Sequence, residues 1–362
     1  MRVWIDILTP KQALFFEPLI DALKERGDEV VVTSRRYREA ELICRKRQID
    51  AVFIGSHGGK ELKNKLSASL ERSKLLLEYF EGDRPDALVS FSSPEAGRVA
   101  FGLGIINICV SDSPHAEAVS KLTIPLADCL LTPWIVPEKS WTVYGIERSK
   151  IESYKALDPF VWLSRKDLSE KFHLDLNIDK SKTTISLRLE ESFAAYIKND
   201  TYTAEFALIQ RLIEEFRNQN IVILCRYSEQ VDAVLKKFKG RVIVPNDIVD
   251  GVALLQQSDL FIGLGGTMTA EAALMGTPAI SFFSGSYFVE RYLVSKGLLT
   301  KPRDIDGVIR VSKNFLRDPK MKKQIKMRAG RIRAGMEDPI RVIVDRLDVL
   351  MRAKLNQELS RK

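Results

Sequence analysis

Histidine and cysteine are both scarce in this sequence, which limits the metal and redox chemistry that it could carry. Three histidines and four cysteines occur among 362 residues. The cysteines form no Cys-x-x-Cys pair and show no metal-ligand spacing, so we expect buried, reduced thiols in place of disulfides or zinc. No Asp-x-Asp pair stands on an expected strand-end loop, where it could hold a divalent cation. We therefore predict neither a bound metal nor any other cofactor.

Long hydrophobic runs are missing too. The longest apolar stretch, residues 99–110, has twelve residues and includes Asn107, whereas a membrane-spanning helix needs about 20. Asp6 places a charge inside what would be the apolar core of a secretory signal. These absences predict a cytoplasmic protein without a membrane-spanning segment.

Excess positive charge is confined to one end of the chain. The net charge is +8, yet residues 301–362 hold 18 Lys and Arg against 8 Asp and Glu, whereas residues 1–300 hold 38 against 40. Such a region is either a solvated helical surface or a contact for acidic lipid, nucleic acid or an anionic substrate. It offers no aromatic platform for single-stranded nucleic acid. We therefore expect no nucleic-acid partner and leave open a peripheral contact with an acidic membrane surface.

Short apolar runs alternate with helical segments along both halves of the chain, which is typical of parallel sheets in α/β proteins. In the first half, strands are expected at residues 2–8, 30–33, 51–54, 87–91, 105–110 and 129–132. In the second half, strands are expected at residues 183–189, 221–226, 242–244, 260–263 and 278–283. Proline and glycine punctuate residues 132–162 between the halves.

This alternation predicts two doubly wound, Rossmann-like domains, residues 1–160 and residues 161–340. A C-terminal helix over residues 341–362 is expected to follow, and it could pack back on the first domain. Ligands of doubly wound sheets bind at the carboxyl ends of the strands. With two such sheets facing each other, we expect the ligand in the cleft between the domains.

The most informative segment joins an expected strand to a helix through the glycine-rich run Gly263-Leu264-Gly265-Gly266. Glycines there would let a phosphate approach the backbone, and the unpaired N–H groups and dipole of the helix N-terminus would attract it. Thr267 and Thr269 add hydroxyl donors, and Glu271 stands where a carboxylate could accept both hydroxyls of a ribose. Tight strand–helix turns also need glycine for packing alone, so the signal is the whole run.

Residues 259–280, which contain this run, resemble the donor-nucleotide motif of the glycosyltransferase-B superfamily. In that superfamily a glycine-rich loop binds the diphosphate of a uridine nucleotide and a helix glutamate holds its ribose. The resemblance implies a nucleotide-sugar site made of Gly265, Gly266, Thr267, Met268, Thr269 and Glu271. The usual glycine-rich loop after the first strand of the second domain is replaced by residues 188–192 (RLEES). Arg188 could clamp a diphosphate there, or it could pair with Glu190 or Glu191.

Three further segments, residues 5–11 (IDILTPK), 111–116 (SDSPHA) and 122–125 (LTIP), resemble an archaeal family catalogued as domain of unknown function 354. The resemblance covers essentially the whole chain. That family is grouped by fold with glycosyltransferases and UDP-N-acetylglucosamine 2-epimerases, which implies a nucleotide-sugar ligand but no particular reaction. The glycine-rich first loop of the lipid-linked N-acetylglucosaminyltransferases, with its catalytic histidine, is absent, and residues 9–12 (TPKQ) replace it.

Candidates for the chemistry follow expected strands of the first domain. His115 stands just past a strand near Asp112, so it could act as a general base on an acceptor hydroxyl, although Asp112 and His115 could instead cap the following helix. Lys11 opens the first helix, where the helix dipole disfavours a cation. A phosphate or carboxylate partner is therefore expected there, with a solvated lysine as the alternative. His57, in a glycine-flanked loop, and Glu95, at a helix start, are further candidates.

The expected function is transfer of a sugar from a nucleotide diphosphate, most simply a UDP-sugar, to an unknown acceptor. Residues 115–118 (HAEA) resemble a His-x-Glu-Ala stretch of the 2-epimerases, so a nucleotide-sugar 2-epimerase is the second alternative. A binding protein without catalysis is the third. The sequence leaves the sugar, the acceptor and the question of a homodimer open.

Overall fold

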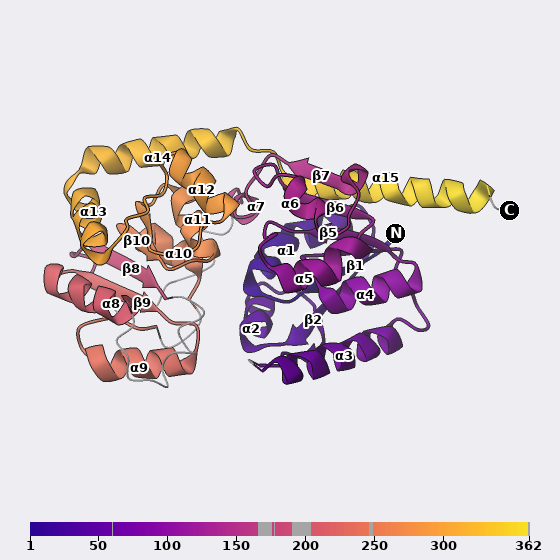
Figure 1. Ribbon diagram of the computed structural model, residues 1–362, viewed down its shortest axis with the longest axis horizontal. Helices are drawn as coiled ribbons and strands as arrows, with labels where there is room; N and C mark the ends of the chain where they lie inside the picture. Colours follow the sequence, from indigo (N-terminus) through magenta and orange to yellow (C-terminus); the bar gives the residue numbers. More distant parts are fainter. Residues whose placement is uncertain (60, 166–175, 177, 190–203, 246–248, 361–362) are drawn as a thin grey trace. The chain divides into compact units, whose positions relative to one another are not determined.

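The computed structural model describes residues 1–59, 61–165, 176, 178–189, 204–245 and 249–360, and the chain divides into two compact units. The N-terminal unit comprises residues 1–162 and 337–362, and the C-terminal unit comprises residues 163–336. Within its described residues, each unit is built around a parallel sheet with helices packed on it (Figure 1).

Seven parallel strands form the sheet of the N-terminal unit, in the order β3-β2-β1-β4-β5-β6-β7. The strands are β1 Arg2–Ile7, β2 Glu29–Arg36, β3 Val52–Ser56, β4 Ala87–Ser90, β5 Ile106–Val110, β6 Cys129–Pro133 and β7 Ile151–Tyr154. Every residue of β4, β5 and β6 is buried, as expected for strands that are covered on both faces. The direction of strand progression reverses between β1 and β4, which is where doubly wound sheets bind ligands.

Two layers of helices cover this sheet. Right-handed crossovers place α1 and α2 on one face and α3, α4 and α5 on the other. The helices are α1 Pro10–Glu25, α2 Arg38–Lys46, α3 Leu62–Tyr79, α4 Pro94–Leu103, α5 Glu117–Thr123, α6 Lys139–Thr142 and α7 Phe160–Leu163, with short 3-10 turns at Ile124–Leu126 and Arg148–Lys150. Pro10 begins α1 at the first helical position, where a missing N–H costs nothing.

The C-terminal unit repeats the strand order of the N-terminal one. Its strands are β8 Thr184–Arg188, β9 Asn220–Leu224, β10 Leu260–Gly263 and β11 Ala279–Ser281, in the order β11-β10-β8-β9. Single parallel bridges add Ile243 beside β9 and Thr300 beside β11. Counted along this unit, the order is therefore 3-2-1-4-5-6, and the reversal lies between β8 and β10.

The helices of the C-terminal unit complete its two layers. They are α8 Ala204–Glu215, α9 Ser228–Phe238, α10 Gly251–Gln257, α11 Thr267–Met275, α12 Phe288–Ser295, α13 Ile305–Arg317 and α14 Pro319–Ala334. The helix α10 packs on α11, α11 packs on α14, and α8 packs on α13. The helix that follows β10 thus begins at Thr267, at the end of the glycine-rich run.

The last helix, α15 (Pro339–Ser360), returns to the N-terminal unit, where it packs on α1 and β5. Ile343 and Leu347 are fully buried by this packing. Arg26 of the segment after α1 also pairs with Asp348 of α15, with 2.8 Å between Nη1 and Oδ1. The N-terminal unit is therefore built from two stretches of chain that are separated by the whole C-terminal unit.

The predicted architecture of two doubly wound sheets is confirmed, with three differences in detail. The strand expected at residues 242–244 is reduced to the single bridge of Ile243. The strand β7 is not among the expected elements, because its sequence is short and punctuated by polar residues. Part of the helix expected from Thr201 lies outside the described residues, which resume at Ala204. Among the helices that the structure describes, none is long and apolar enough to cross a bilayer.

The packing of α15 predicts that Leu347→Ala destabilises the N-terminal unit by about 2–5 kcal/mol, since truncating a buried leucine leaves a cavity. Leu347 is fully buried and Leu355, two turns further along the same helix, is 52% exposed. Leu355→Ala is therefore the matched control and should change stability by less than about 0.5 kcal/mol. Urea denaturation measures both, and equal effects of the two changes would contradict the docking of α15.

Candidate functional site

Two polar sites lie at the carboxyl ends of the strands, one in each unit, and each flanks the reversal of strand order. In the N-terminal unit, Lys11 is the second residue of α1, directly after β1. Its ammonium lies 2.6 Å from Oδ2 of Asp112, which follows β5, and 2.7 Å from Oδ2 of Asp158, which follows β7. Tyr154, the last residue of β7, donates its hydroxyl hydrogen to Asp158 Oδ1 at 2.6 Å. Carboxylates from the segments after β5 and β7 thus converge on the one ammonium group that α1 supplies.

The protonation of this cluster follows from its burial and from its excess of carboxylates. Burial opposes the charge of Lys11, but Asp112 and Asp158 outweigh it and raise the pKa of the ammonium. Burial likewise opposes the charge of Asp112, yet Lys11 and hydrogen bonds from Asp158, Lys11 and Ser113 hold its pKa below the usual range. Burial raises the pKa of Asp158 to about 7, where attraction by Lys11 is offset by the neighbouring Asp112. Below that pH the two carboxyl groups therefore share one proton, held on Asp158.

His115 lies at the edge of this cluster, in the turn between β5 and α5, and its side chain is exposed. Partial burial lowers its pKa, Asp112 acts in the opposite direction, and Lys11 adds to the lowering. A neutral imidazole at neutral pH follows, and only the neutral form can accept a proton. The capping alternative for Asp112 is wrong, because α5 begins at Glu117 with Ala116 at its N-cap. Lys11 is likewise no solvated lysine, since it has two carboxylate partners.

His57 and Glu95 do not join the cluster around Lys11. His57 follows the edge strand β3, which β2 separates from β1. Its ring stacks on Tyr37 with 5.0 Å between ring centroids, and its Nδ1 accepts the backbone N–H of Gly59 at 3.1 Å. Glu95 is buried in the first turn of α4, where its Oε2 lies 3.4 Å from the guanidinium of Arg72.

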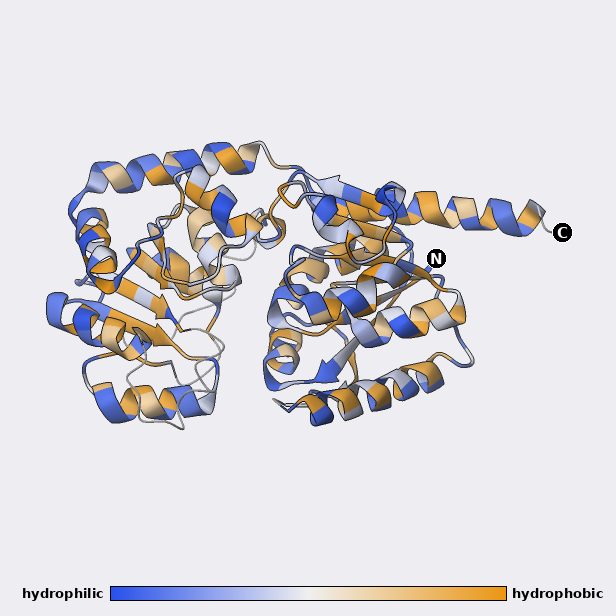
Figure 2. Ribbon diagram, in the orientation of Figure 1, coloured by the Kyte–Doolittle hydropathy of each residue, from blue (hydrophilic) through white to orange (hydrophobic). Residues whose placement is uncertain are grey.

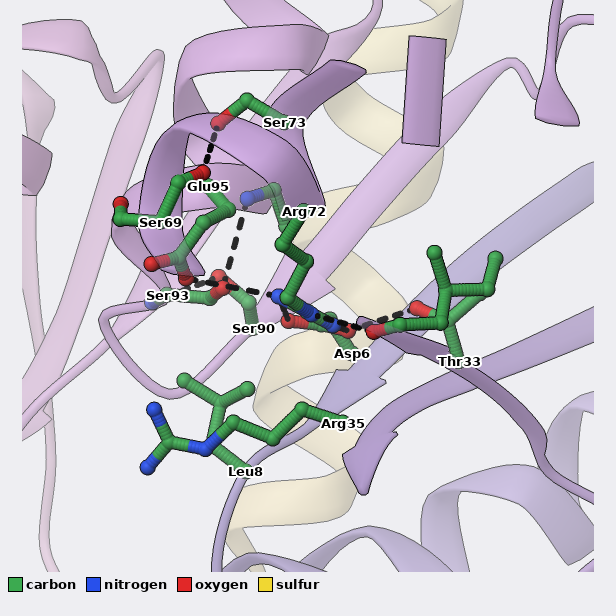
Figure 3. A network of polar contacts seen from close by, with 12 residues as sticks. Asp6, Leu8, Thr33, Arg35, Ser69, Arg72, Ser73, Ser90, Ser93 and Glu95 are labelled. Carbon is green, nitrogen blue, oxygen red and sulfur yellow. Dashed lines mark hydrogen bonds and ion pairs between the residues drawn. The ribbon is translucent and has the colours of Figure 1, made fainter. Parts of the chain in front are cut away.

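Glu95 belongs instead to a buried network beneath the strand reversal (Figure 3). Arg72 reaches from α3 to Asp6 in β1, with 2.5 Å between Nη2 and Oδ1. Its Nε donates to the carbonyl of Ile54 at 3.0 Å, and Thr33 donates its hydroxyl hydrogen to Asp6 at 2.6 Å. Arg72 and Asp6 are 1% and 0% exposed, so solvent does not weaken this pair. The network fixes α3 and the start of α4 against the central strand.

In the C-terminal unit the glycine-rich run forms the turn from β10 into α11. Gly265 and Gly266 adopt φ of 103° and 88°, a region that favours glycine. A Cβ on Gly263 would lie 2.0 Å from the hydroxyl oxygen of Thr269, so this position has no room for a side chain. Gly266 is the N-cap residue of α11 and has no side chain to cap the first turn. Gly266 is exposed, and no side chain of its own covers the backbone N–H groups at this end of the helix.

The remaining predicted residues of this site lie around the same turn. The carbonyl of Arg188, at the end of β8, accepts the N–H of Leu264 at 3.1 Å, which brings Arg188 beside the glycine-rich loop. Glu190 and Glu191, its alternative partners, lie outside the described residues. Thr267 opens α11, Met268 packs in the apolar cluster of Val222, Leu224 and Leu254, and Thr269 is buried. Glu271 is 4% exposed, and a Cβ on Gly251 would lie 3.3 Å from its Oε2.

The fold agrees with comparisons to known proteins. Residues 1–352 match a family model described as "Protein of unknown function (DUF354)". The chain belongs to this family. It is 28% identical over 366 residues to the uncharacterized protein MJ0665 of Methanocaldococcus jannaschii, with 96% of this chain and 98% of that protein covered.

Solved structures share the fold of this DUF354 chain at low identity. The UDP-GlcNAc 2-epimerase of Neisseria meningitidis, bound to UDP-GlcNAc, has a TM-score of 0.72 at 16% identity, covering 96% of this chain and 99% of the epimerase. Spinosyn forosaminyltransferase SpnP has a TM-score of 0.64 at 15% identity, covering 97% and 99%. The glycosyltransferase-B fold is thereby confirmed. At such identity the comparisons establish the fold alone.

Sequence reasoning missed four residues of these sites. Asp158 and Tyr154 fall in residues 132–162, whose sequence indicates a domain boundary. Asp158-Pro159 is a signal of a helix start, but the four residues of β7 (IESY) are too short and too polar to indicate a strand. Asp6 and Arg72 were hidden for another reason. A charge in the middle of an apolar strand signals a buried partner, but the sequence does not say which distant residue supplies it. Among the described residues, no group of three or more His, Cys, Asp and Glu side chains could hold a metal ion.

The shared proton predicts a pH dependence of stability. The pKa of Asp158 is about 7 in the folded protein, whereas an unperturbed aspartate has 3.8. The folded state therefore binds this proton more tightly than the unfolded chain does. The resulting stabilisation is complete below about pH 4 and is lost as pH rises towards 7. Asp158→Asn keeps the neutral shape and a donor towards Asp112 but cannot titrate. The unfolding free energy of the wild type should therefore fall more steeply than that of the variant between pH 5 and about 7.5, and parallel curves would contradict the shared proton.

Proposed function

We propose that this chain is a metal-independent enzyme that binds a UDP-sugar at the glycine-rich loop of its C-terminal unit and transfers the sugar to an acceptor. The observation that carries the proposal is the uncapped N-terminus of α11 behind Gly265 and Gly266. Backbone N–H groups at a helix N-terminus bind phosphate, and the helix dipole adds about half a positive charge. Glycines without side chains let the diphosphate reach them.

Arg188 and Glu271 supply the specificity in this proposal. Arg188 ends β8, the strand that neighbours β10, and a guanidinium there can bind two diphosphate oxygens at once. Glu271 lies one turn into α11, on the side of α10. In the glycosyltransferase-B motif that this segment resembles, the corresponding carboxylate accepts the two hydroxyls of the ribose. The same position in this chain holds Glu271, whose carboxylate has the charge that this role needs.

The cluster around Lys11 supplies the chemistry in this proposal. Lys11, Asp112 and Asp158 bind one another, which holds the ammonium in a fixed place. His115, exposed beside them, has its pKa lowered by partial burial and therefore accepts a proton at neutral pH. Sugar transfer requires such a base to remove one proton from the acceptor hydroxyl. The acceptor oxygen forms its bond to the sugar as the bond between the sugar and UDP breaks, so His115 takes the proton and UDP leaves as the anion.

A nucleotide-sugar 2-epimerase is the second candidate, favoured by the fold that this chain shares with such epimerases. A protein that binds the nucleotide-sugar without catalysis is the third. Incubation with UDP-GlcNAc alone separates them. An epimerase converts the sugar without an acceptor, a transferase shows slow hydrolysis at most, and a binding protein only retains the ligand. Appearance of the 2-epimer would overturn transfer as the leading proposal.

The ribose role predicts that Glu271→Gln weakens binding of UDP, because a neutral amide replaces a charged acceptor. The loss of a hydrogen bond to a charged group costs about 1.5–3 kcal/mol, roughly a tenfold to hundredfold rise in Kd. Isothermal titration calorimetry with UDP measures it. Since Glu271 is buried, the melting temperature of the variant must be measured as well. Unchanged affinity in a stably folded variant would refute the ribose role.

The base role predicts that His115→Asn lowers turnover by about 10²–10⁴-fold while leaving the Kd of the donor unchanged. The variant keeps a polar side chain of similar size but cannot take up a proton near neutral pH. His57→Asn is the matched control, because His57 lies at the edge strand β3 and should change turnover little. Equal turnover of His115→Asn and the wild type would exclude His115 and direct attention to Lys11 and Asp112.

The basic helix α14 predicts a peripheral contact with acidic membranes. Its sixteen residues include seven Lys and Arg and no Asp or Glu, and basic residues near an anionic membrane each contribute about 1 kcal/mol. The protein should float with vesicles of phosphatidylcholine and phosphatidylserine at low salt, and should be released at high salt. The triple change of Lys320, Lys323 and Lys326 to Glu should abolish flotation. Absence of wild-type flotation at low salt would leave α14 as a solvated surface.

A further inference from the structure

An arginine at the carboxyl edge of the N-terminal sheet is left without a polar partner among the described residues. Arg35 is the second-last residue of β2, and its guanidinium makes no hydrogen bond or ion pair with any residue that the structure describes. Its Nε is buried, so water does not reach that atom. Figure 3 shows the guanidinium extending past Leu8, away from Asp6, with no dashed line to it. Because buried polar groups nearly always have a partner, this group is available to a ligand.

The position of Arg35 follows from the register of the central strands. Parallel pairing places Ser34 level with Ile7, so Arg35 lies beside Leu8, directly after β1. The strand β2 changes from hydrophobic to hydrophilic towards this end (Figure 2). The carboxylates that bind Lys11 follow β5 and β7, beyond the reversal between β1 and β4. Arg35 therefore stands at the same edge of the sheet as the cluster around Lys11, on the other side of the reversal.

The carboxylates near Arg35 do not satisfy it. Asp6 and Glu95 both bind Arg72, at 2.5 Å and 3.4 Å, and neither pairs with Arg35. Burial lowers the pKa of Arg35, attraction by Glu95 acts against this, and repulsion by Arg72 adds to the lowering. An oxyanion bound to Arg35 would form charge-assisted hydrogen bonds and would offset both the burial and the repulsion.

The strand ends around Arg35 are held in place by polar and aromatic contacts. Gln12 accepts the N–H of Leu8 at 2.6 Å and donates to the carbonyl of Phe91 at 3.2 Å, which ties the ends of β1 and β4 together. Ser92, the next residue, has φ of 51°, in the left-handed region that non-glycine residues rarely adopt. Strained backbone of this kind is concentrated at ligand sites. The ring centroid of Tyr37 lies 6.0 Å from Cζ of Arg35, so a cation–π contact also restrains the guanidinium.

We propose that Arg35 binds an oxyanion group of the second substrate, a phosphate or a carboxylate, so that the sugar acceptor is an anion. A guanidinium presents two parallel N–H groups to such an oxyanion. The role as an acceptor contact rests on the proposed sugar transfer, whereas the oxyanion site itself does not. Three strand spacings of about 4.8 Å separate the ends of β2 and β5. The anionic group is therefore distinct from the acceptor hydroxyl that meets His115.

The first test measures how fast phenylglyoxal, which modifies accessible guanidinium groups, reacts with Arg35 in the full chain, as read by mass spectrometry of its peptides. Inorganic phosphate and acetate are the two probes, each added in the presence of UDP, because an acceptor binds beside the donor. At about ten times its Kd, a bound probe should slow the modification of Arg35 about tenfold. The adjacent Arg36, which is exposed, is the internal control and should react at a constant rate. Slowing by phosphate alone or by acetate alone identifies the oxyanion, and no slowing by either overturns the proposal.

The second test compares Arg35→Gln with Arg36→Gln as its matched control. In the presence of UDP, the effective probe should raise the melting temperature of the wild type and of Arg36→Gln, and should raise that of Arg35→Gln much less. If Arg35 only balanced the charges of Asp6 and Glu95, Arg35→Gln would melt at a lower temperature yet keep the full shift, and that result overturns the proposal. UDP alone tests the nucleotide site separately. A wild type whose melting temperature does not respond to UDP contradicts that site, while the difference between the two variants still decides the oxyanion site.

Discussion

The buried ion pair between Arg72 and Asp6 holds the N-terminal unit in its working arrangement. Arg72 passes over Gly55, where a Cβ would lie 2.8 Å from the arginine side chain, and it binds groups from β1, β3 and α4 at once. Removing either partner would leave an uncompensated buried charge, which costs about 3–5 kcal/mol. The orientation of α3 depends on this pair, and so do the start of α4 and the strand reversal beside Lys11.

The two units share a strand order but differ in the chemistry at the reversal. In the N-terminal unit the carboxyl ends hold titratable groups, with one proton shared between Asp112 and Asp158 beside Lys11. In the C-terminal unit the carboxyl end of β10 offers backbone groups instead of titratable side chains, because three of the four positions before α11 are glycine. The first kind of edge suits proton transfer, and the second suits anion binding without a side-chain cation. In the proposed function this difference separates a donor unit from a reacting unit.

Most of the fold could be predicted from the sequence, because buried parallel strands have continuous apolar sequences. The glycine-rich loop could also be predicted, since close approach of backbone atoms demands glycine at fixed positions. The partner of Lys11 could be predicted only as a class, a carboxylate or phosphate, from its misfit with the helix dipole. That the carboxylates are Asp112 and Asp158 depends on the alignment of β5 and β7, and tertiary pairing of that kind leaves no local pattern. Arg72 was missed for the same reason, as it lies 66 residues from Asp6.

The return of α15 to the N-terminal unit has a consequence for how the protein is made. Synthesis proceeds from the N-terminus, and domains generally fold as they emerge. The sheet of the N-terminal unit is complete at Tyr154, yet β5 and α1 lack the cover of α15 until residues 339–360 have been synthesised. During the time needed to translate the C-terminal unit, the surface that will receive Ile343 and Leu347 stays bare. A nascent chain stalled before residue 339 is therefore expected to be a client of chaperones that recognise exposed apolar surface.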